Sequence, residues 1–297
     1  MALIESPEEV RNVVTNAAPG WRCGGVLMAS PTYFAVETAL NPWATDDRGN
    51  LNAVDTAAAV RQWDALADAY RGLKLCVDMI DAPKGLADFC FAANQSLVFV
   101  DEEGKSGALL SRMASESRAP EVEHFKAFYR EQGYTLHELP EGFHFEGAGD
   151  AIRHADKRLH WGGVGPRTSE AAWEFFAGVA DADVIPLKLV DPRFYHLDTC
   201  LSLLDERSAL YVPAAFDHAS RAVIEAAFER LHAVSDADAA NFACNAHCPD
   251  SRHVLIQQGS RGTTAWLKQA GFVPIELDTS EFMKSGGSVF CLKQELP

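Results

Sequence analysis

The sequence lacks the features of a membrane-spanning or exported protein. No apolar run reaches the roughly 18 residues that a membrane helix needs. Residues 1–20 contain Glu5, Glu8, Glu9 and Arg11 and no continuous apolar segment, which argues against a signal peptide. We therefore expect a globular protein of the cytoplasm that does not interact with membranes.

Cysteines are few and irregularly placed. The seven cysteines are scattered along 297 residues, and their number is odd. A disulfide-stabilised secreted domain favours an even number of cysteines in a shorter chain. A reducing compartment is therefore expected, in which most thiols act as small buried hydrophobic groups.

Basic residues are also scarce. The chain has 26 Lys and Arg against 42 Asp and Glu, for a formal net charge of −16. A field of this sign disfavours nucleic acid and anionic membranes as partners. It would attract a small cationic substrate, although acidity that serves solubility explains the charge equally well. We predict a small-molecule substrate, and the sequence leaves a homo-oligomer open.

The common cofactor and metal motifs are absent. No Gly-rich dinucleotide motif follows a predicted strand, and residues 162–165 are too short for a phosphate-binding loop and lack its lysine. The nearest metal pattern is Cys244 and Cys248 with His247 between them, which lacks a second ligand pair at zinc spacing. We therefore predict no cofactor and no metal.

Short apolar strands alternating with helices make up most of the chain. The order strand–strand–helix–strand recurs at intervals of roughly 50–60 residues, the scale of a supersecondary repeat. No linker rich in Pro, Gly or Ser divides the chain, so one α/β domain over residues 1–297 is predicted. The predicted helices cover residues 55–73, 120–132, 169–179, 217–231 and 263–270, and the last predicted strand covers 289–292.

Five polar clusters stand at strand ends or in Gly-rich loops, where functional sites are commonly built on a rigid scaffold. They cover residues 88–94, 145–150, 161–167, 195–200 and 284–291. In the last cluster, a loop through Gly286 and Gly287 leads to Cys291 on the predicted terminal strand. A thiolate there could attack a substrate. Spacing alone favours the simpler alternative of a buried core cysteine after a turn.

His196 and Asp198 would share one face of a strand, because side chains two residues apart point the same way. Histidine is a common general acid and base near neutral pH. A histidine satisfied within a loop explains this pattern equally well. Glu146 lies between Phe145 and Gly147, where a lone carboxylate is usually a solvated turn residue.

Taken in order, these clusters resemble the amidinotransferase/dimethylarginine dimethylaminohydrolase superfamily, the penteins, from about Met28 to the C-terminus. The resemblance implies a five-bladed α/β propeller of ββαβ pseudo-repeats around a polar channel. Residues 145–150 resemble the element that supplies a catalytic carboxylate, which implies that role for Glu146. The resemblance likewise implies His196 as general acid/base and Cys291 as nucleophile.

The cluster at residues 88–94 resembles the substrate-gripping strand of the superfamily. Arginine deiminases typically have an Arg-Asp pair where this chain has Ala93 and Asn94. An Asn there is similar to arginine dihydrolases, which convert arginine to ornithine, carbon dioxide and two ammonia, and to the longer succinylarginine dihydrolases. The resemblance implies that the substrate-binding residues are Asn94, Asp198, Arg167, Arg112, Asn41 and Gly149, with Arg167 pairing with the substrate carboxylate.

The leading prediction is therefore an arginine dihydrolase that forms a covalent adduct on Cys291. A deiminase or a dimethylarginine dimethylaminohydrolase-like enzyme would use the same chemistry but stop at citrulline. An amidinotransferase would replace water with an amine. A non-catalytic propeller, like the ribosome-binding translation factors of this fold, would not need Cys291, His196 and Glu146 together, and its RNA partner would be repelled by the net charge.

Overall fold

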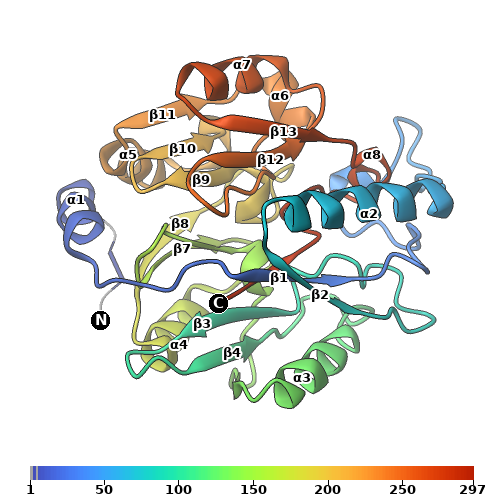
Figure 1. The fold of residues 1–297 in the computed structure, drawn as a ribbon, viewed down its shortest axis with the longest axis horizontal. Helices are drawn as coiled ribbons and strands as arrows, with labels where there is room; N and C mark the ends of the chain where they lie inside the picture. Colours follow the sequence, from blue (N-terminus) through green and yellow to red (C-terminus); the bar gives the residue numbers. More distant parts are fainter. Residues whose placement is uncertain (1–2, 5) are drawn as a thin grey trace.

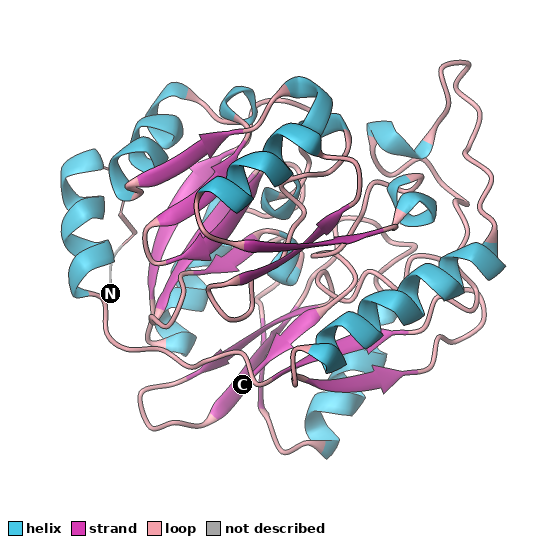
Figure 2. Ribbon diagram, turned by 45° about the horizontal axis from the view of Figure 1, so that its top comes forward, coloured by secondary structure: helices cyan, strands magenta, loops and turns pink. Residues whose placement is uncertain are grey.

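A computed structural model describes residues 3, 4 and 6–297 of the chain. Its strands form five separate small sheets, four of three strands and one of two. In the three-stranded sheets an antiparallel pair is joined to a parallel third strand, and the helices lie on the outside of the sheets (Figures 1 and 2). The predicted five-bladed propeller of ββαβ units is confirmed.

Each sheet with its crossover helix is called a blade. The first contains β1 (Gly25–Ala29), α2 (Thr56–Gly72), β2 (Cys76–Ile80) and β14 (Gln294–Leu296). The second contains β3 (Ser96–Val100), β4 (Ser106–Leu110), α3 (Glu121–Glu131) and β5 (Thr135–Glu138). The third contains β6 (Ala151–Arg153), β7 (Leu159–Val164), α4 (Glu170–Ala180) and β8 (Asp183–Lys188).

The fourth blade contains β9 (Leu201–Asp205), β10 (Ser208–Tyr211), α5 (His218–Ala227) and β11 (Arg230–Ala233). The fifth contains β12 (His253–Gln257), α7 (Arg261–Gln269) and β13 (Val273–Leu277). An isolated antiparallel bridge between His247 and Leu255 stands where its remaining strand would lie. Helices α1 (Pro7–Asn16), α6 (Asp236–Ala240) and α8 (Ser280–Met283) lie outside these units.

Helix α2 shows how the sequence specifies these elements. Asp55 caps its N-terminus by accepting a hydrogen bond from the backbone N–H of Ala58. Trp63, Leu66 and Tyr70 follow at helical spacing and are buried against β1 and β13. The predicted helix over residues 55–73 is confirmed. The cap at Asp55, the helical spacing of the apolar residues and the end at Gly72 all indicate the same helix.

The ring is closed by pairing the two ends of the chain. β1 pairs with β2 in parallel and with β14 antiparallel, with Gly25 opposite Leu296. The C-terminal segment therefore runs through the middle of the molecule (Figure 1). This closure carries the residues just before β14, including Cys291, into the centre of the propeller.

The predicted terminal strand over residues 289–292 is wrong. Cys291 lies in a turn, and strand pairing begins only at Gln294. Backbone N–H groups of this turn donate hydrogen bonds to a distant residue. The apolar pattern of the sequence does not reveal such bonds. The predicted helix over 217–231 also ends early, at Ala227, because residues from Arg230 pair with β10.

Five of the helices and strands that the structure describes were not predicted: α1, α6, α8, β9 and β14. Helix α1 packs against α5, so its apolar side, with Val10 and Val14 buried, is covered. Glu5, used above to argue against a signal peptide, lies outside the described residues. Among the helices that the structure describes, none has both the length and the hydrophobicity to cross a membrane.

Candidate active site

The turn that carries Cys291 is fixed by the side-chain amide of Asn245. Its Oδ1 accepts hydrogen bonds from the backbone N–H groups of Ser288 (3.1 Å) and Phe290 (3.0 Å). Its Nδ2 donates to Sγ of Cys291 at 3.1 Å. Sequence reasoning missed Asn245, whose only signal is a polar residue within the apolar stretch 242–246.

The Cys291 thiol points at a buried carboxylate. Sγ donates to Oδ2 of Asp198 at 3.0 Å, and Cys291 is only 2% exposed. Burial, and then the charge of Asp198, raise the pKa of Cys291 well above its ordinary value. Oδ1 of Asp198 has no hydrogen-bond partner among the described residues. The resting nucleophile is therefore a protonated thiol beside an acceptor that remains available.

His196 is paired with Glu146. Their Nε2 and Oε2 atoms are 2.9 Å apart, and both side chains are buried. Burial alone would raise the pKa of Glu146, but the hydrogen bond and charge of His196, with Arg167, hold it well below its usual range. Glu146 is therefore ionised and orients the imidazole.

The expectation that His196 and Asp198 share a strand face is wrong. Residues Leu197–Thr199 form a short 3-10 turn, with His196 just before it. Asp150 holds this turn, because its Oδ1 accepts from the backbone N–H of Leu197 at 3.1 Å. The turn still places His196 and Asp198 around one centre, where they meet Glu146 and Cys291.

Asn94 lies in the turn before β3 and faces an arginine. Its Oδ1 accepts from Nη1 of Arg118 at 2.9 Å, while its Nδ2 has no partner among the described residues. Arg118 is itself buried and paired with Glu121 at 2.8 Å. A Cβ at Gly149 would collide with Nδ2 of Asn94 and lie 3.2 Å from Nδ1 of His196, so glycine keeps this space open.

The two arginines predicted to bind substrate lie in different places. Arg167 donates from Nη1 to Oε2 of Glu146 at 2.9 Å and from Nη2 to the Leu40 carbonyl at 2.6 Å. Arg112 instead donates to the Leu139 carbonyl at 3.0 Å and lines a separate hollow. The structure does not bring Arg112 to the site. Arg118 is the second arginine there, and nothing in the sequence distinguishes it from Arg112.

A cavity of about 20 Å³ lies at the site, and its lining residues include Asn41, Asn94, Arg118, Arg167 and Cys291. Asn41 donates to the Ser285 carbonyl at 2.9 Å and so ties its loop to the segment before the nucleophile. The cavity has room for one or two water molecules. An amino acid is larger than this cavity, so residues that line it would have to move for one to enter.

Comparison with known sequences identifies the family of the chain. Residues 30–296 match the family model described as N,N dimethylarginine dimethylhydrolase, eukaryotic. The chain is 38% identical over 270 residues to the bifunctional arginine dihydrolase/ornithine cyclodeaminase AgrE of Nostoc sp., covering 90% of this chain but only 37% of AgrE. It is 35% identical to the N(G),N(G)-dimethylarginine dimethylaminohydrolase of Mycobacterium tuberculosis, covering 91% of this chain and 84% of that protein.

Solved structures show the same fold. The N-terminal domain of ArgZ, a cyanobacterial arginine dihydrolase, was solved as a cysteine-to-serine variant bound to substrate. It superposes with a TM-score of 0.85 at 36% identity, covering 91% of this chain and 97% of that domain. A dimethylarginine dimethylaminohydrolase of Pseudomonas aeruginosa shares the fold alone, with a TM-score of 0.78 at 18% identity. The chain therefore belongs to the N,N dimethylarginine dimethylhydrolase family of pentein-fold proteins.

Proposed function

We propose that this protein is an arginine dihydrolase, which converts L-arginine and two waters to ornithine, carbon dioxide and two ammonia through a covalent adduct on Cys291. One observation carries the proposal. A thiol, a His–Glu pair, an unpaired carboxylate oxygen and an unpaired amide N–H converge on one buried centre. The chain spans 37% of the length of AgrE, so the proposal concerns the dihydrolase reaction alone.

The guanidinium of arginine suits the free acceptor of this site. Asp198 Oδ1 would accept one of its N–H groups in a charge-assisted hydrogen bond. The arriving positive charge would also lower the pKa of the Cys291 thiol, which burial and Asp198 raise in the resting protein. Substrate binding would therefore favour the thiolate that attacks.

In the first cycle, the Cys291 thiolate attacks the guanidinium carbon and one nitrogen leaves as ammonia. His196 supplies the proton for this departure. Its Nε2 is held by Glu146, so Nδ1, which faces the space beside Gly149, is the nitrogen that transfers protons. His196 then takes a proton from water, which attacks the adduct and releases a ureido group.

The second cycle acts on that neutral ureido group, and Asn94 supports it. Its acceptor oxygen is already engaged by Arg118, so the group presented to substrate is the Nδ2 donor. A donor matches the ureido carbonyl oxygen, which an ionised Asp could not bind because it only accepts. Attack by Cys291, loss of the second ammonia and hydrolysis then give carbon dioxide and ornithine.

Arg118 and Arg167 would bind the α-carboxylate, which selects an amino acid over a simple guanidine. Arg118 reaches the cavity with its Nη1 on Asn94. To bind the carboxylate, Arg167 would first break its hydrogen bond to Glu146. Because Arg167 also donates to the Leu40 carbonyl, this movement would be coupled to the loop that contains Leu40. Asn41 and Gly149 would complete the substrate site by holding the loop and keeping space beside Asn94.

A dimethylarginine hydrolase is the second candidate, favoured by the family match and by the M. tuberculosis relative, of which the chain covers 84%. The same nucleophile and His–Glu pair would serve it. It would stop at citrulline after one cycle.

An end-product assay tests the proposal. Purified protein is incubated separately with arginine, citrulline and dimethylarginine, and ornithine, citrulline and ammonia are quantified. We expect ornithine and two ammonia per arginine, ornithine from citrulline, and no turnover by the matched Cys291→Ser variant.

Two results would overturn this assignment. Citrulline with one ammonia as the end product from arginine would make the protein a deiminase. Turnover of dimethylarginine alone would favour the second candidate. An Asn94→Asp variant tests the second cycle: ornithine release at the full rate would contradict the role given to its amide donor.

A further inference from the structure

The side-chain amide of Asn245 contacts the sulfur atom of the proposed nucleophile. Asn245 is 0% exposed and lies between α6 and β12. Its Nδ2 carries two hydrogens, and it donates to Sγ of Cys291 at 3.1 Å and to the backbone carbonyl of Asp198 at 3.0 Å. One amide therefore joins the nucleophile to the turn that carries Asp198, although the three residues are far apart in the sequence.

The hydrogen-bond partners fix which end of this amide faces the sulfur. Its Oδ1 lies 3.1, 3.0 and 3.3 Å from the backbone nitrogens of Ser288, Phe290 and Cys291, which are all donors. Rotating the amide by half a turn would place Nδ2 against these donors and Oδ1 against the Asp198 carbonyl, which only accepts. The donor end is therefore the end at Sγ of Cys291.

The two polar contacts of the sulfur respond in opposite ways to loss of its proton. In the resting protein, Sγ of Cys291 donates to Oδ2 of Asp198 at 3.0 Å. In the thiolate, that contact would bring two negative charges together, whereas the contact with Nδ2 of Asn245 would become a charge-assisted hydrogen bond, roughly twice as strong as a neutral one. Burial and Asp198 raise the pKa of Cys291, and the hydrogen bond from Asn245 lowers it.

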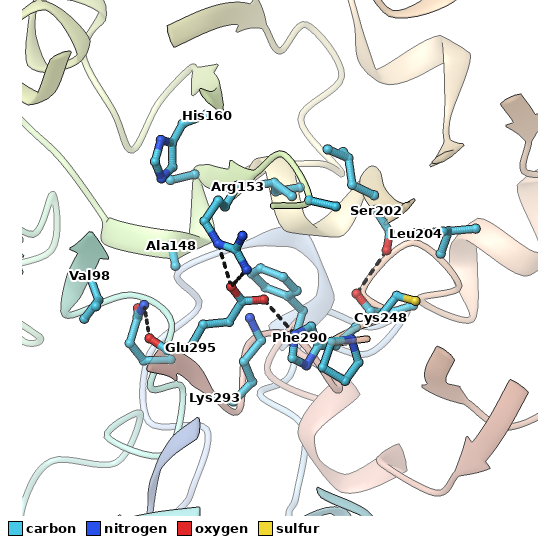
Figure 3. Close-up of a pocket in the computed structure, with 18 of the residues that line it drawn as sticks. Val98, Ala148, Arg153, His160, Ser202, Leu204, Cys248, Phe290, Lys293 and Glu295 are labelled. Atoms are coloured by element: carbon cyan, nitrogen blue, oxygen red, sulfur yellow. Dashed lines mark hydrogen bonds and ion pairs between the residues drawn. The ribbon is translucent and has the colours of Figure 1, made fainter. Parts of the chain in front are cut away.

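The sulfur is closed off from the neighbouring chamber of the protein. That chamber has a volume of about 50 Å³, and Phe290, Lys293 and Glu295 line it from the C-terminal segment (Figure 3). It shares no lining residue with the cavity at Cys291, where a bound substrate would displace water. Among the described residues, Nδ2 of Asn245 is the one hydrogen-bond donor to Sγ. A thiolate facing substrate therefore depends on this amide for a protein donor.

We propose that Asn245 is a catalytic residue, whose Nδ2–H donates to the Cys291 thiolate whenever the sulfur carries negative charge. This happens at two points of each cycle, which rest on the proposed function. Before attack, the thiol proton has passed to water, and the electron pair of sulfur then forms the bond to the guanidinium carbon. In hydrolysis, the oxygen of water bonds to that carbon, the C–S bond breaks and its electron pair returns to sulfur.

The same contact is weaker in the adduct between these two points. The sulfur bonded to carbon is neutral and is only a weak acceptor. A donor that binds thiolate more strongly than the adduct therefore favours departure of sulfur from the adduct, as well as ionisation of the thiol.

A purely structural role would need only the other end of the amide. The N–H groups of Ser288, Phe290 and Cys291 all donate to Oδ1, and these bonds hold the turn. That role predicts no response of Nδ2 to the protonation state of the sulfur. The catalytic role predicts that the Nδ2–H group senses loss of the thiol proton, so a measurement on Nδ2 itself separates the two.

The test follows this amide by NMR while Cys291 is titrated. The protein is labelled with ¹⁵N in its asparagine side chains, and the signal that is lost in Asn245→Ala identifies Asn245. We expect one of its two Hδ2 resonances to move downfield with rising pH, with the midpoint at which iodoacetamide alkylates Cys291. The Cys291→Ser variant should lose this movement.

The alkylation midpoint is the second measurement. Loss of one hydrogen bond to a charged group in Asn245→Ala should raise this midpoint by at least about one pH unit. The matched control is Ser202→Ala, which removes a buried hydrogen bond of 3.1 Å to the carbonyl of the neighbouring residue Ala246. Ser202 makes no hydrogen bond to Cys291 among the described residues, so this variant should leave the midpoint unchanged.

The outcomes decide between the two roles. An Hδ2 resonance that does not move, or that moves equally in Cys291→Ser, overturns the proposal, and so does an unchanged midpoint in Asn245→Ala. Should the thiol titrate above the pH at which the protein unfolds, the same titration is made in Asp198→Asn, which lacks the opposing charge. Should Asn245→Ala not fold, the amide is assigned from nuclear Overhauser contacts to Cys291, and its titration decides.

None of these measurements uses turnover, so they do not depend on the identity of the substrate. Titration of the amide in a protein that leaves arginine unchanged would keep the role of Asn245 and reject the proposed function. Conversion of arginine to ornithine by a protein whose amide does not titrate would keep the function and reject this role.

Discussion

The Cys291 thiol and the Asp198 carboxylate are joined by a hydrogen bond of 3.0 Å inside the protein, with no water-exposed surface around the carboxylate. Burial is the largest cause of the raised pKa of Cys291, and this contact adds to it. A carboxylate beside a thiol opposes formation of a second negative charge. The Cys291 thiol is therefore protonated in the resting protein.

The Asp198→Asn variant tests this relationship. Removing the charge should lower the pKa of Cys291, so alkylation by iodoacetamide should reach half its maximal rate at a lower pH than in the unaltered protein. Quantifying the Cys291 peptide by mass spectrometry separates it from the six other cysteines, and Cys291→Ser supplies the blank. An unchanged midpoint would show that burial alone raises the pKa.

Arg118 and Arg112 offer a matched pair for testing which arginine binds substrate. Arg118→Lys keeps the charge but loses the planar fork, so we expect KM for arginine to rise at least about tenfold, roughly the loss of one charge-assisted hydrogen bond. Arg112→Lys should leave KM within about twofold, because Arg112 bonds a backbone carbonyl away from the cavity. Steady-state kinetics decide, and the reverse ranking would restore Arg112 to the site.

Gly149 is expected to be indispensable for activity but not for folding. In Gly149→Ala the new methyl group would press on Asn94 and on Nδ1 of His196, so we expect kcat/KM to fall by at least about 100-fold, since small misplacements of reacting groups are costly. Gly178→Ala is the control, because its Cβ meets nothing within 4 Å on helix α4. That change should stabilise the protein by about 0.5–1 kcal/mol. Full activity in Gly149→Ala would remove the glycine from the site.

The stability of the protein should fall in acid because of buried histidines. Burial lowers the pKa of His160 to about 3, whereas an unfolded histidine titrates near 6.5. The unfolded state therefore binds the extra proton between these values, so stability is intact above pH 6.5 and is lost as the pH falls toward 3.

The His160→Phe variant measures that contribution. Between pH 7.5 and pH 5 the unaltered protein should lose about 2 kcal/mol more stability than the variant, as measured by urea unfolding. Phenylalanine suits the site because His160 packs edge-on against Phe176 at 4.9 Å. The exposed residue His218 serves as control, and His218→Gln should leave the acid loss unchanged. If His160→Phe lost as much stability in acid as the unaltered protein, the pKa of His160 would not be lowered in the folded state.

The sequence determined the repeating strand and helix order, because apolar periodicity, caps and glycine stops are local signals that tertiary contacts left intact, as in α2. It also placed Cys291, His196 and Glu146 in recognisable segments through their resemblance to a known superfamily. Short elements such as β9 and α6 carry too few residues to show a period and were missed.

Only the tertiary structure decided which distant groups meet. Asn245 holds the Cys291 turn across 46 residues, and Arg118 rather than Arg112 reaches Asn94, because blade packing and not sequence spacing sets these contacts. The burial of the Lys293 side chain against the Phe290 ring is likewise a property of the folded state, since only packing among the blades removes the water that would solvate it.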